Sequence, residues 1–330
     1  MSELGQNNPL DRRDFLLRAA KAGAAILAAG GVSLWLHDHK GPPANTVGKT
    51  VSLPDFSLPV NGPKMSIVTG VDRVKTVNRA LAALGGIERF IKSGDRVVLK
   101  VNAAFASPPA LSATSHPELV AEVARLCLRA GAASVIVTDN PINDPQSCFS
   151  LTGIARAAES AGAKIALPTP SSFKLTTLAD ATLIKDWPLL IGPFQGVTKL
   201  IGLAPVKSHN RSGASLTMKN WYGLLGGRRN VFHQDINTII FELARLVRPT
   251  LVILDGTSTM LTNGPTGGSL DDLKATNTMI ASTDAVAADA FGATLLGKTA
   301  ASLPFIGKAA AAGLGTTDFE SLNPLRDHVD

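Results

Sequence analysis

Residues 197–235 read VTKLIGLAPVKSHNRSGASLTMKNWYGLLGGRRNVFHQD. This stretch carries the most information about the fold and the site of the protein. It opens with an apolar run, Leu200–Leu203, that is long enough for a buried strand. It then changes abruptly into a polar, basic segment that contains Gly213, Gly223, Gly226 and Gly227. A strand that ends in such a loop delivers side chains to the carboxyl edge of a sheet, where open α/β folds bind their ligands. A solvated basic loop is the alternative, but the glycines favour a site because they permit a close backbone approach.

Strand and helix patterns alternate on both sides of this stretch. Short β-type runs predict strands at 65–69, 96–101, 134–138, 164–167, 200–203, 251–254 and 276–281. Apolar residues at helical spacing predict helices at 72–91, 117–130, 151–161, 236–246, 285–296 and 304–312. Strands separated by helices are typical of parallel pairing. The sequence therefore predicts an α/β fold, with a mostly parallel sheet and helices on both faces.

The chain divides by composition into three parts. We expect residues 1–40 to form a leader, the Pro- and Gly-rich residues 41–64 a linker, and residues 65–330 the α/β domain. Residues 168–198 are less regular, and 173–178 with 182–185 are candidates for an antiparallel excursion or small second lobe.

The leader resembles a twin-arginine export signal. Arg12-Arg13 is followed by Phe15 and then by a modestly apolar, Ala- and Gly-rich stretch, Ala22–Leu36. This pattern predicts the twin-arginine translocation machinery as a partner and a periplasmic or otherwise exported location. No clear cleavage site precedes His37, so an uncleaved membrane anchor is an alternative.

Composition narrows the class of ligand. The net charge is +6, and residues 1–40 add only one unit to it, because they hold five basic and four acidic side chains. A basic balance suits an anionic ligand. Nucleic acid is a poor match, because there is no dense basic run and only 5% of residues are aromatic. The two cysteines are too few for a four-thiolate iron–sulfur cluster, so we expect no such cluster to be bound by this chain alone.

Polar residues follow or end four of the predicted strands. In a parallel sheet these ends lie on one edge, so we expect the side chains to converge there: Lys100, Asn102, Asp139, Asn140, Lys207, His209 and Asp255. Asp and Asn also favour the turns after strands, which is the structural alternative for each of them alone.

These residues suggest an anion site with acid–base groups. The proposed catalytic residues are His209, His116, His233, Asp139 and Asp255. The proposed substrate-binding residues are Lys100, Asn102, Lys207, Lys219, Asn220, Gly264 and Gly267. The histidines with a carboxylate are also candidates for a divalent metal, although no metal-binding spacing supports one. For His116 a capping role is an equal alternative, and for Arg228-Arg229 an exposed loop pair is favoured.

Together these segments resemble the family called domain of unknown function 362. The matching segments occur in family order across about 95–292: Lys100-Val101-Asn102, Thr114–Pro117, Asp139, Lys207–His209, Met218–Gly223, His233, Arg248–Gly256, Gly264–Gly268 and Asp284–Asp289. The resemblance implies an α/β domain in which these residues meet. It supplies no activity.

The chain also departs from the family pattern. Relatives often carry a second lysine near Pro205, a glutamate in the segment before Gly264 and an additional ferredoxin-like cluster domain. This chain departs from the pattern near Pro205, reads Leu261-Thr262-Asn263 before Gly264 and lacks the cysteines of that domain. The leading hypothesis is an exported enzyme acting on a small anionic substrate. The alternative is a non-catalytic periplasmic ligand-binding or redox-accessory protein that works with a separate iron–sulfur protein.

Overall fold

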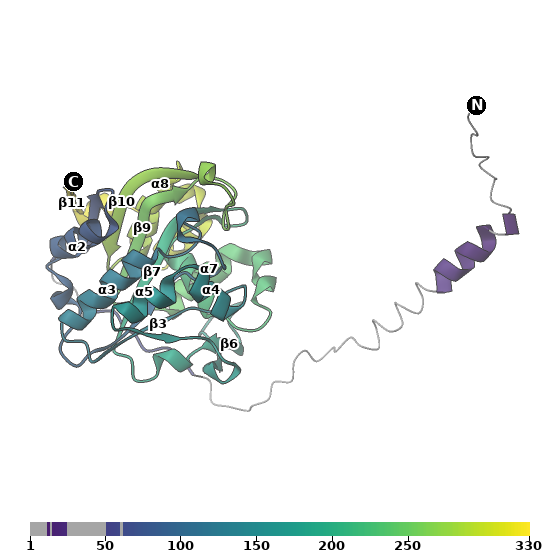
Figure 1. The fold of residues 1–330 in the computed structure, drawn as a ribbon, viewed down its shortest axis with the longest axis horizontal. Helices are drawn as coiled ribbons and strands as arrows, with labels where there is room; N and C mark the ends of the chain where they lie inside the picture. The colour runs from purple at the N-terminus through teal and green to yellow at the C-terminus, as the bar shows by residue number, and fades with distance from the viewer. Residues whose placement is uncertain (1–11, 14, 25–50, 60–61) are drawn as a thin grey trace. The chain divides into compact units, whose positions relative to one another are not determined.

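The computed structural model describes residues 12–13, 15–24, 51–59 and 62–330 (Figure 1). The chain divides into two units, Met1–Gly48 and Lys49–Asp330. In the first, residues 12–13 and 15–24 are helical, and the rest of the expected leader lies outside the described residues. Among the residues that are described, no helix combines the length and the apolarity needed to cross a membrane.

A nine-stranded sheet forms the centre of the second unit, in the order β11-β1-β10-β9-β7-β2-β3-β4, with β8 paired to β7. The strands are β1 (Met65–Thr69), β2 (Arg96–Lys100), β3 (Ser134–Thr138), β4 (Lys164–Ala166), β7 (Lys199–His209), β8 (Gly213–Ser215), β9 (Leu251–Met260), β10 (Leu273–Ser282) and β11 (Leu325–His328). The five neighbours from β4 to β9 are parallel, and β10 runs antiparallel to both β9 and β1. The predicted α/β class with a mostly parallel sheet is confirmed.

Helices cover both faces of this sheet. They are α2 (Arg73–Ala83), α3 (Pro117–Arg129), α4 (Pro145–Leu151), α5 (Ile154–Ser160), α6 (Thr217–Asn220), α7 (Ile236–Leu246), α8 (Ala285–Leu295) and α9 (Pro304–Ala311). Figure 1 shows α2, α3 and α5 over one face, where α3 packs against both of the others. Helices α6 to α9 pack on the opposite face.

The alternation of side chains along each strand decides which face a residue serves. Val97 and Leu99 of β2 join the core under α2, α3 and α5, whereas Val98 joins the core under α6 to α9. Lys100 has the same parity as Val98. A strand-end residue is therefore assigned to one side of the sheet by the register of the apolar residues that precede it.

The helix boundaries follow from local capping. Asp72 accepts hydrogen bonds from the amides of Val74 and Lys75 at the start of α2, and Asp284 accepts one from Ala287 at the start of α8. The helix expected at 72–91 is shorter, because α2 ends at Ala83 and Gly85 and Gly86 follow with positive φ. Helix α4 was not predicted.

Strand β7 is much longer than the expected strand at 200–203. It continues through Pro205, which has no N–H group to donate. Proline is tolerated there because β2 no longer pairs with β7 beyond Gly202, and because the pairing of β7 with β9 shifts in register between Pro205 and Lys207. Its last residues form a hairpin with β8, in which Lys207 lies opposite Ser215. The first part of the expected loop is thus strand, and it carries Lys207 and His209.

Strand β9 also continues beyond its predicted end. Asp255 lies within it, because β9 and β10 form a long hairpin whose connection is the glycine-rich segment 263–268. The expected terminal loop contains β11, which adds a parallel edge strand beside β1. Both differences arise from pairing with another strand, β10 for β9 and β1 for β11, which the pattern of one strand does not display.

The irregular segment 168–198 contains a two-stranded antiparallel sheet, β5 (Phe173–Thr176) with β6 (Trp187–Leu190). The expected partner 182–185 does not pair with β5, because the backbone amides of Thr182, Leu183 and Ile184 donate to the Glu242 carboxylate instead. Residues 51–59, part of the expected linker, pack on the domain through buried Leu53 and Phe56. Cys127 and Cys148 are both buried and free.

Candidate anion-binding site

The strand order of the sheet changes direction between β2 and β7. From β2 the chain proceeds to β3 and β4 on one side, and from β7 it proceeds to β9 on the other. The carboxyl ends of parallel strands at such a switch in direction form a crevice, which is where open α/β sheets bind ligands. The basic stretch quoted above leaves this crevice and folds back over it.

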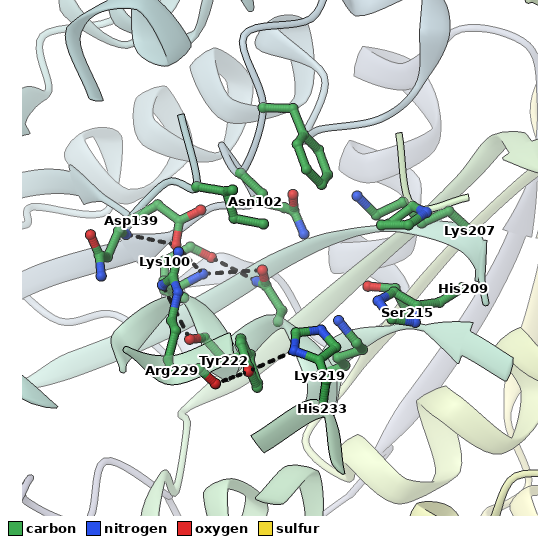
Figure 2. A pocket seen from close by; sticks show the side chains of 17 residues that line it. Lys100, Asn102, Asp139, Lys207, His209, Ser215, Lys219, Tyr222, Arg229 and His233 are labelled. Carbon is green, nitrogen blue, oxygen red and sulfur yellow. Dashed lines mark hydrogen bonds and ion pairs between the residues drawn. The ribbon is translucent and has the colours of Figure 1, made fainter. Parts of the chain in front are cut away.

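A cavity of about 160 Å³ lies at this point. Figure 2 shows side chains from separate segments of the chain directed toward it. Eight of the predicted site residues line it: Lys100, Asn102, Asp139, Lys207, His209, Lys219, Asn220 and His233. Phe105, Ser215, Tyr222, Arg229 and Pro265 are among the lining residues that were not predicted as site residues.

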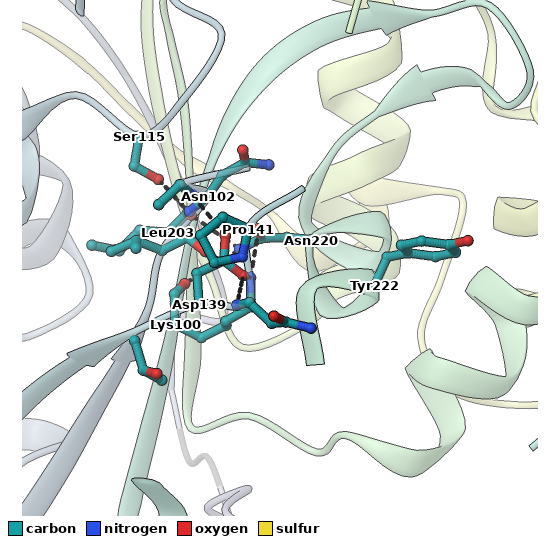
Figure 3. Close-up of polar contacts among 12 residues, drawn as sticks. Lys100, Asn102, Ser115, Asp139, Pro141, Leu203, Asn220 and Tyr222 are labelled. Carbon is teal, nitrogen blue, oxygen red and sulfur yellow. Dashed lines mark hydrogen bonds and ion pairs between the residues drawn. The ribbon is translucent and has the colours of Figure 1, made fainter. Parts of the chain in front are cut away.

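Lys100 is fully engaged by the protein itself (Figure 3). Its ammonium lies 2.7 Å from Asp139 Oδ1, and it donates to Asn220 Oδ1 at 3.1 Å and to the Val101 carbonyl at 2.6 Å. An ammonium has three protons, so none remains for a ligand. Burial lowers the pKa of Lys100, and the nearby Asp139 carboxylate opposes that effect. The predicted substrate-binding role of Lys100 is therefore replaced by a structural ion pair.

Asp139 and Asn220 complete this structural network. Asp139 also accepts hydrogen bonds from the amides of Ala103 at 2.7 Å and Asn140 at 2.9 Å. The Asn220 amide group donates to the carbonyls of Lys100 and Leu203, where β2 and β7 separate. Asp139 and Asn220 thus link Lys100 to the backbone at the ends of β2, β3 and β7.

Replacing Gly223 with alanine should disrupt this network. A Cβ atom there would lie 2.0 Å from Asp139 Oδ1 and 2.8 Å from Lys100 Nζ, so the buried ion pair would have to separate. Breaking such a pair costs roughly 3–5 kcal/mol. We expect a loss of this size in urea unfolding. Gly268→Ala is the matched control, because no atom lies within 4 Å of its Cβ position; equal stability of the two variants would contradict the prediction.

Lys207 and Lys219 differ from Lys100, since neither has a carboxylate partner among the described residues. The Lys207 ammonium donates to the Ala113 carbonyl and lies 5.2 Å from the centre of the Phe105 ring. The Lys219 ammonium lies 5.3 Å from the centre of the Tyr222 ring and makes no hydrogen bond to any described residue. An enclosed ammonium without a counterion suits an anionic ligand that would supply one.

The same enclosure changes how readily these two lysines hold a proton. Burial first, and then the charge of Lys219, lowers the pKa of Lys207 to about 7. Burial and the charge of Arg229 lower the pKa of Lys219 to about 7. Near neutral pH both amines can therefore exchange protons, which is the property required of an acid–base group.

The two cavity histidines have complementary hydrogen-bonding states. His209 Nδ1 accepts from the amides of Arg211 at 3.1 Å and Ser212 at 3.2 Å, so the neutral ring carries its proton on Nε2. Burial first, and then the neighbouring Lys219, His233 and Lys207, lower the pKa of His209 to about 2, so it stays a neutral donor. It cannot serve as the general base proposed from the sequence.

His233 has the opposite tautomer. Its Nδ1 lies 3.2 Å from the Asn230 carbonyl, which can only accept, and 3.2 Å from Tyr222 Oη, whose proton goes to the Arg229 carbonyl. Nδ1 therefore holds the proton and Nε2 is left as an acceptor. Burial lowers the pKa of His233, which keeps it neutral at pH 7. The His209 and His233 rings are stacked with centroids 6.0 Å apart.

Asn102 supplies a further unused polar group. Its side-chain Oδ1 is buried and has no hydrogen-bond partner among the described residues, although Asn102 lines the cavity. A buried polar atom of this kind is costly unless a ligand or water satisfies it. The groups available for a ligand are thus the two unneutralised lysines, the His209 N–H, His233 Nε2 and the Asn102 amide.

The exposed position predicted for at least one of Arg228 and Arg229 holds for Arg228 and not for Arg229. Arg228 is exposed, as expected, but Arg229 lines the cavity and donates to the carbonyls of Pro141 at 2.8 Å and Leu225 at 3.1 Å. Tyr222 was also missed. Its spacing of three residues from Lys219 was the available signal, because residues three apart on a helical turn share a face.

Helix α6, which presents Lys219, is fixed by Asp289 of α8. The Asp289 carboxylate accepts from the amides of Thr217 at 2.8 Å and Met218 at 3.0 Å, and burial raises its pKa to about 7. This explains the unusual carboxylate in an Ala-rich helix. The Asp289 carboxylate points into the protein interior and fixes the position of α6, and therefore of Lys219.

His116 and Asp255 lie outside the cavity. Asp255 has the parity of Ile253, which packs under α2 and α3, so it faces the side of the sheet opposite to Lys100. There it binds Arg73 at 2.9 Å. His116 precedes α3 and lies 3.5 Å from Glu118, and its pKa is lowered by burial and by Arg73.

Gly264 and Gly267 do not line the cavity either. The Gly264 amide donates to Ser208 Oγ at 3.2 Å and the Gly267 amide to the Asn263 carbonyl at 3.0 Å, so neither is available to bind an anion. Only Pro265 of this segment lines the cavity. In the described part of the chain, no group of three or more His, Cys, Asp or Glu side chains is arranged to hold a metal ion.

Comparison with known proteins gives the family. The model of the family described as domain of unknown function (DUF362) matches residues 97–294, more than half of the chain. A thylakoid-associated protein of Synechocystis is 28% identical over 267 residues, which cover 74% of this chain and 76% of that protein.

Two solved structures are partly similar. The lactate racemase apoprotein from Thermoanaerobacterium thermosaccharolyticum has a TM-score of 0.40 and 11% identity, and the match covers 73% of this chain and 58% of the racemase. A Thermotoga maritima protein has a TM-score of 0.34 and 13% identity, covering 56% of this chain and 51% of its own. The present chain thus spans little more than half the length of either structure. On the match over residues 97–294, the chain belongs to the DUF362 family.

Proposed function

We propose that this protein is an enzyme that binds a small carboxylate or phosphate anion in the cavity and transfers a proton to or from it. The observation that carries the proposal is the combination, in one enclosed space, of two lysines that have no carboxylate partner in the described part of the chain and two neutral histidines of opposite tautomer. Lys207 and Lys219 would hold the anion. Electrostatic groups enclosed away from water act more strongly than in solution.

The remaining groups then have distinct roles. His233 Nε2 would accept the proton, because it is the unprotonated nitrogen of a neutral ring. The His209 Nε2–H group would donate a hydrogen bond to the oxygen on which negative charge develops. A neutral imidazole can perform that second role when its pKa is held low. Lys219 would return a proton, since its pKa near 7 permits both states.

The test has two steps. Calorimetry with sulfate should first show binding that Lys207→Met and Lys219→Met both weaken. A ligand retained by the purified protein is then identified by native mass spectrometry and incubated with the protein in D₂O. Wild-type protein should incorporate deuterium into it, and His233→Gln should bind it without incorporation. Binding without incorporation by wild type would favour the non-catalytic binding protein.

Export by the twin-arginine route is a second part of the proposal. The motivating residues are Arg12-Arg13 and Phe15 in a short helical segment. A reporter fused to residues 1–48 should reach the periplasm, and Arg12→Lys with Arg13→Lys should retain it in the cytoplasm. Transport of the double variant at the wild-type rate would exclude this route.

A further inference from the structure

We propose that the ligand of this site is an amphipathic anion, with a carboxylate or phosphate head in the lysine cavity and an apolar extension in a neighbouring groove. This deepens the proposed function and rests on it. A groove of about 400 Å³ adjoins the cavity. It shares five wall residues with the cavity: Asn140, Ile142, Tyr222, Arg229 and His233. A ligand that extends past these shared residues would occupy both spaces.

The groove offers mainly apolar surface. Beyond the shared wall it is lined by Pro141, Phe173, Gly226, Gly227 and Asn230. Ile142, which lines both the cavity and the groove, has 62% of its surface exposed. A bound apolar group would remove both Ile142 and Phe173 from water.

Two of the polar side chains along the groove, Asn140 and Arg229, donate to backbone carbonyls of the protein. Asn140 Nδ2 donates to the Leu225 carbonyl at 2.8 Å, and Arg229 donates to the Pro141 carbonyl at 2.8 Å. The unneutralised ammonium groups of Lys207 and Lys219 belong to the cavity and do not line the groove. Because both ammonium groups lie in the cavity, while Arg229 lines both spaces and donates to carbonyls, the anionic end of the ligand would face the cavity and its apolar end the groove.

The two glycines keep the groove open. A Cβ on Gly226 would lie 2.6 Å from the Phe173 ring, so a larger residue would displace that ring. Gly227 has φ of +59°, a conformation that other residues adopt at a cost. The backbone thus forms one wall directly, and Phe173 lies against it.

The test compares two probes that differ only in the extension. Methyl phosphate and phenyl phosphate are titrated into the protein by calorimetry at one pH and one ionic strength. Phenyl phosphate should bind about tenfold more tightly, the ratio expected when a ring is removed from water against Phe173 and Ile142. Phe173→Ala should remove this preference while leaving the affinity for methyl phosphate unchanged.

Because Phe173 also packs on the core, Ile142→Ser provides a second variant that should fold normally. It should reduce the preference about threefold, whereas Leu151→Ser, an equally exposed leucine away from both spaces, should not. Equal affinity for both probes, or a preference that neither variant changes, would overturn this inference. Failure of methyl phosphate itself to bind would instead refute the proposed anion site.

Discussion

Replacing Lys219 with methionine should weaken sulfate binding by roughly 10- to 150-fold, because a hydrogen bond to a charged group contributes about 1.5–3 kcal/mol. Lys219 is suited to this role because its ammonium lies 5.3 Å from the centre of the Tyr222 ring and has no protein acceptor among the described residues. The thermal midpoint should rise in the same variant. Methionine fills a similar volume and removes a charge whose burial is unfavourable, which should add about 1 kcal/mol or slightly more.

Weaker sulfate binding together with a higher melting temperature distinguishes a ligand-binding residue from a structural one. Lys274→Met is the matched control, because Lys274 is exposed and lies away from the cavity. It should alter neither the melting temperature nor the affinity. If Lys219→Met lowered the melting temperature, or bound sulfate as wild type does, Lys219 would be a structural residue and the anion site would lose its main support.

Sulfate affinity should fall steeply as the pH rises above about 7. Binding favours the charged forms of Lys207 and Lys219, whose pKa values are both about 7. Above that value the protein must take up protons to bind. The dissociation constant should rise about tenfold for each pH unit if one proton is taken up, and about 100-fold if two are. Sulfate is a suitable probe because it does not titrate in this range.

Proton uptake can be measured directly by calorimetry in buffers with different ionisation enthalpies. At pH 8 the number of protons taken up should lie between one and two. The variant with both lysines changed to methionine provides the control and should show no uptake. Binding that is independent of pH from 7 to 9 would contradict the assignment of Lys207 and Lys219 as the anion ligands.

Without an anion, the same two groups make stability depend on pH. Their folded pKa values of about 7 lie below the ordinary value of 10.5. Between these values the unfolded chain binds more protons than the folded chain, so stability increases with pH from about 7 toward 10.5. Sulfate should reverse part of this dependence, because it stabilises the folded form most strongly at the lower pH.

The sequence was sufficient to predict the α/β architecture and several of the residues that meet at the cavity. Apolar runs separated by helical patterns predicted the parallel sheet, and polar residues at strand ends predicted that Lys100, Asp139, Lys207 and His209 would meet. These predictions succeeded because strand and helix periodicity are local properties, and because parallel strands bring their carboxyl ends to one edge.

The tertiary structure decided which of these groups remain available. Lys100 and Lys207 both follow apolar strand residues, yet only Lys100 has a carboxylate and an amide oxygen beside it. Asp255 faces the opposite side of the sheet because β9 continues past it and strand parity places it with Ile253. The state of each histidine depends on amides and carbonyls brought to it by the backbone fold.

What the sequence by itself determined was therefore the class of fold and the kinds of residue at the sheet edge. Only the tertiary structure showed that Lys100 is paired with Asp139, whereas Lys207 and Lys219 have no carboxylate partner among the described residues. It also showed that Arg229 lines the cavity. The reason is physical. Residue type and spacing fix where a side chain begins, whereas its charge state and free hydrogen-bonding groups depend on neighbours that are distant in the chain.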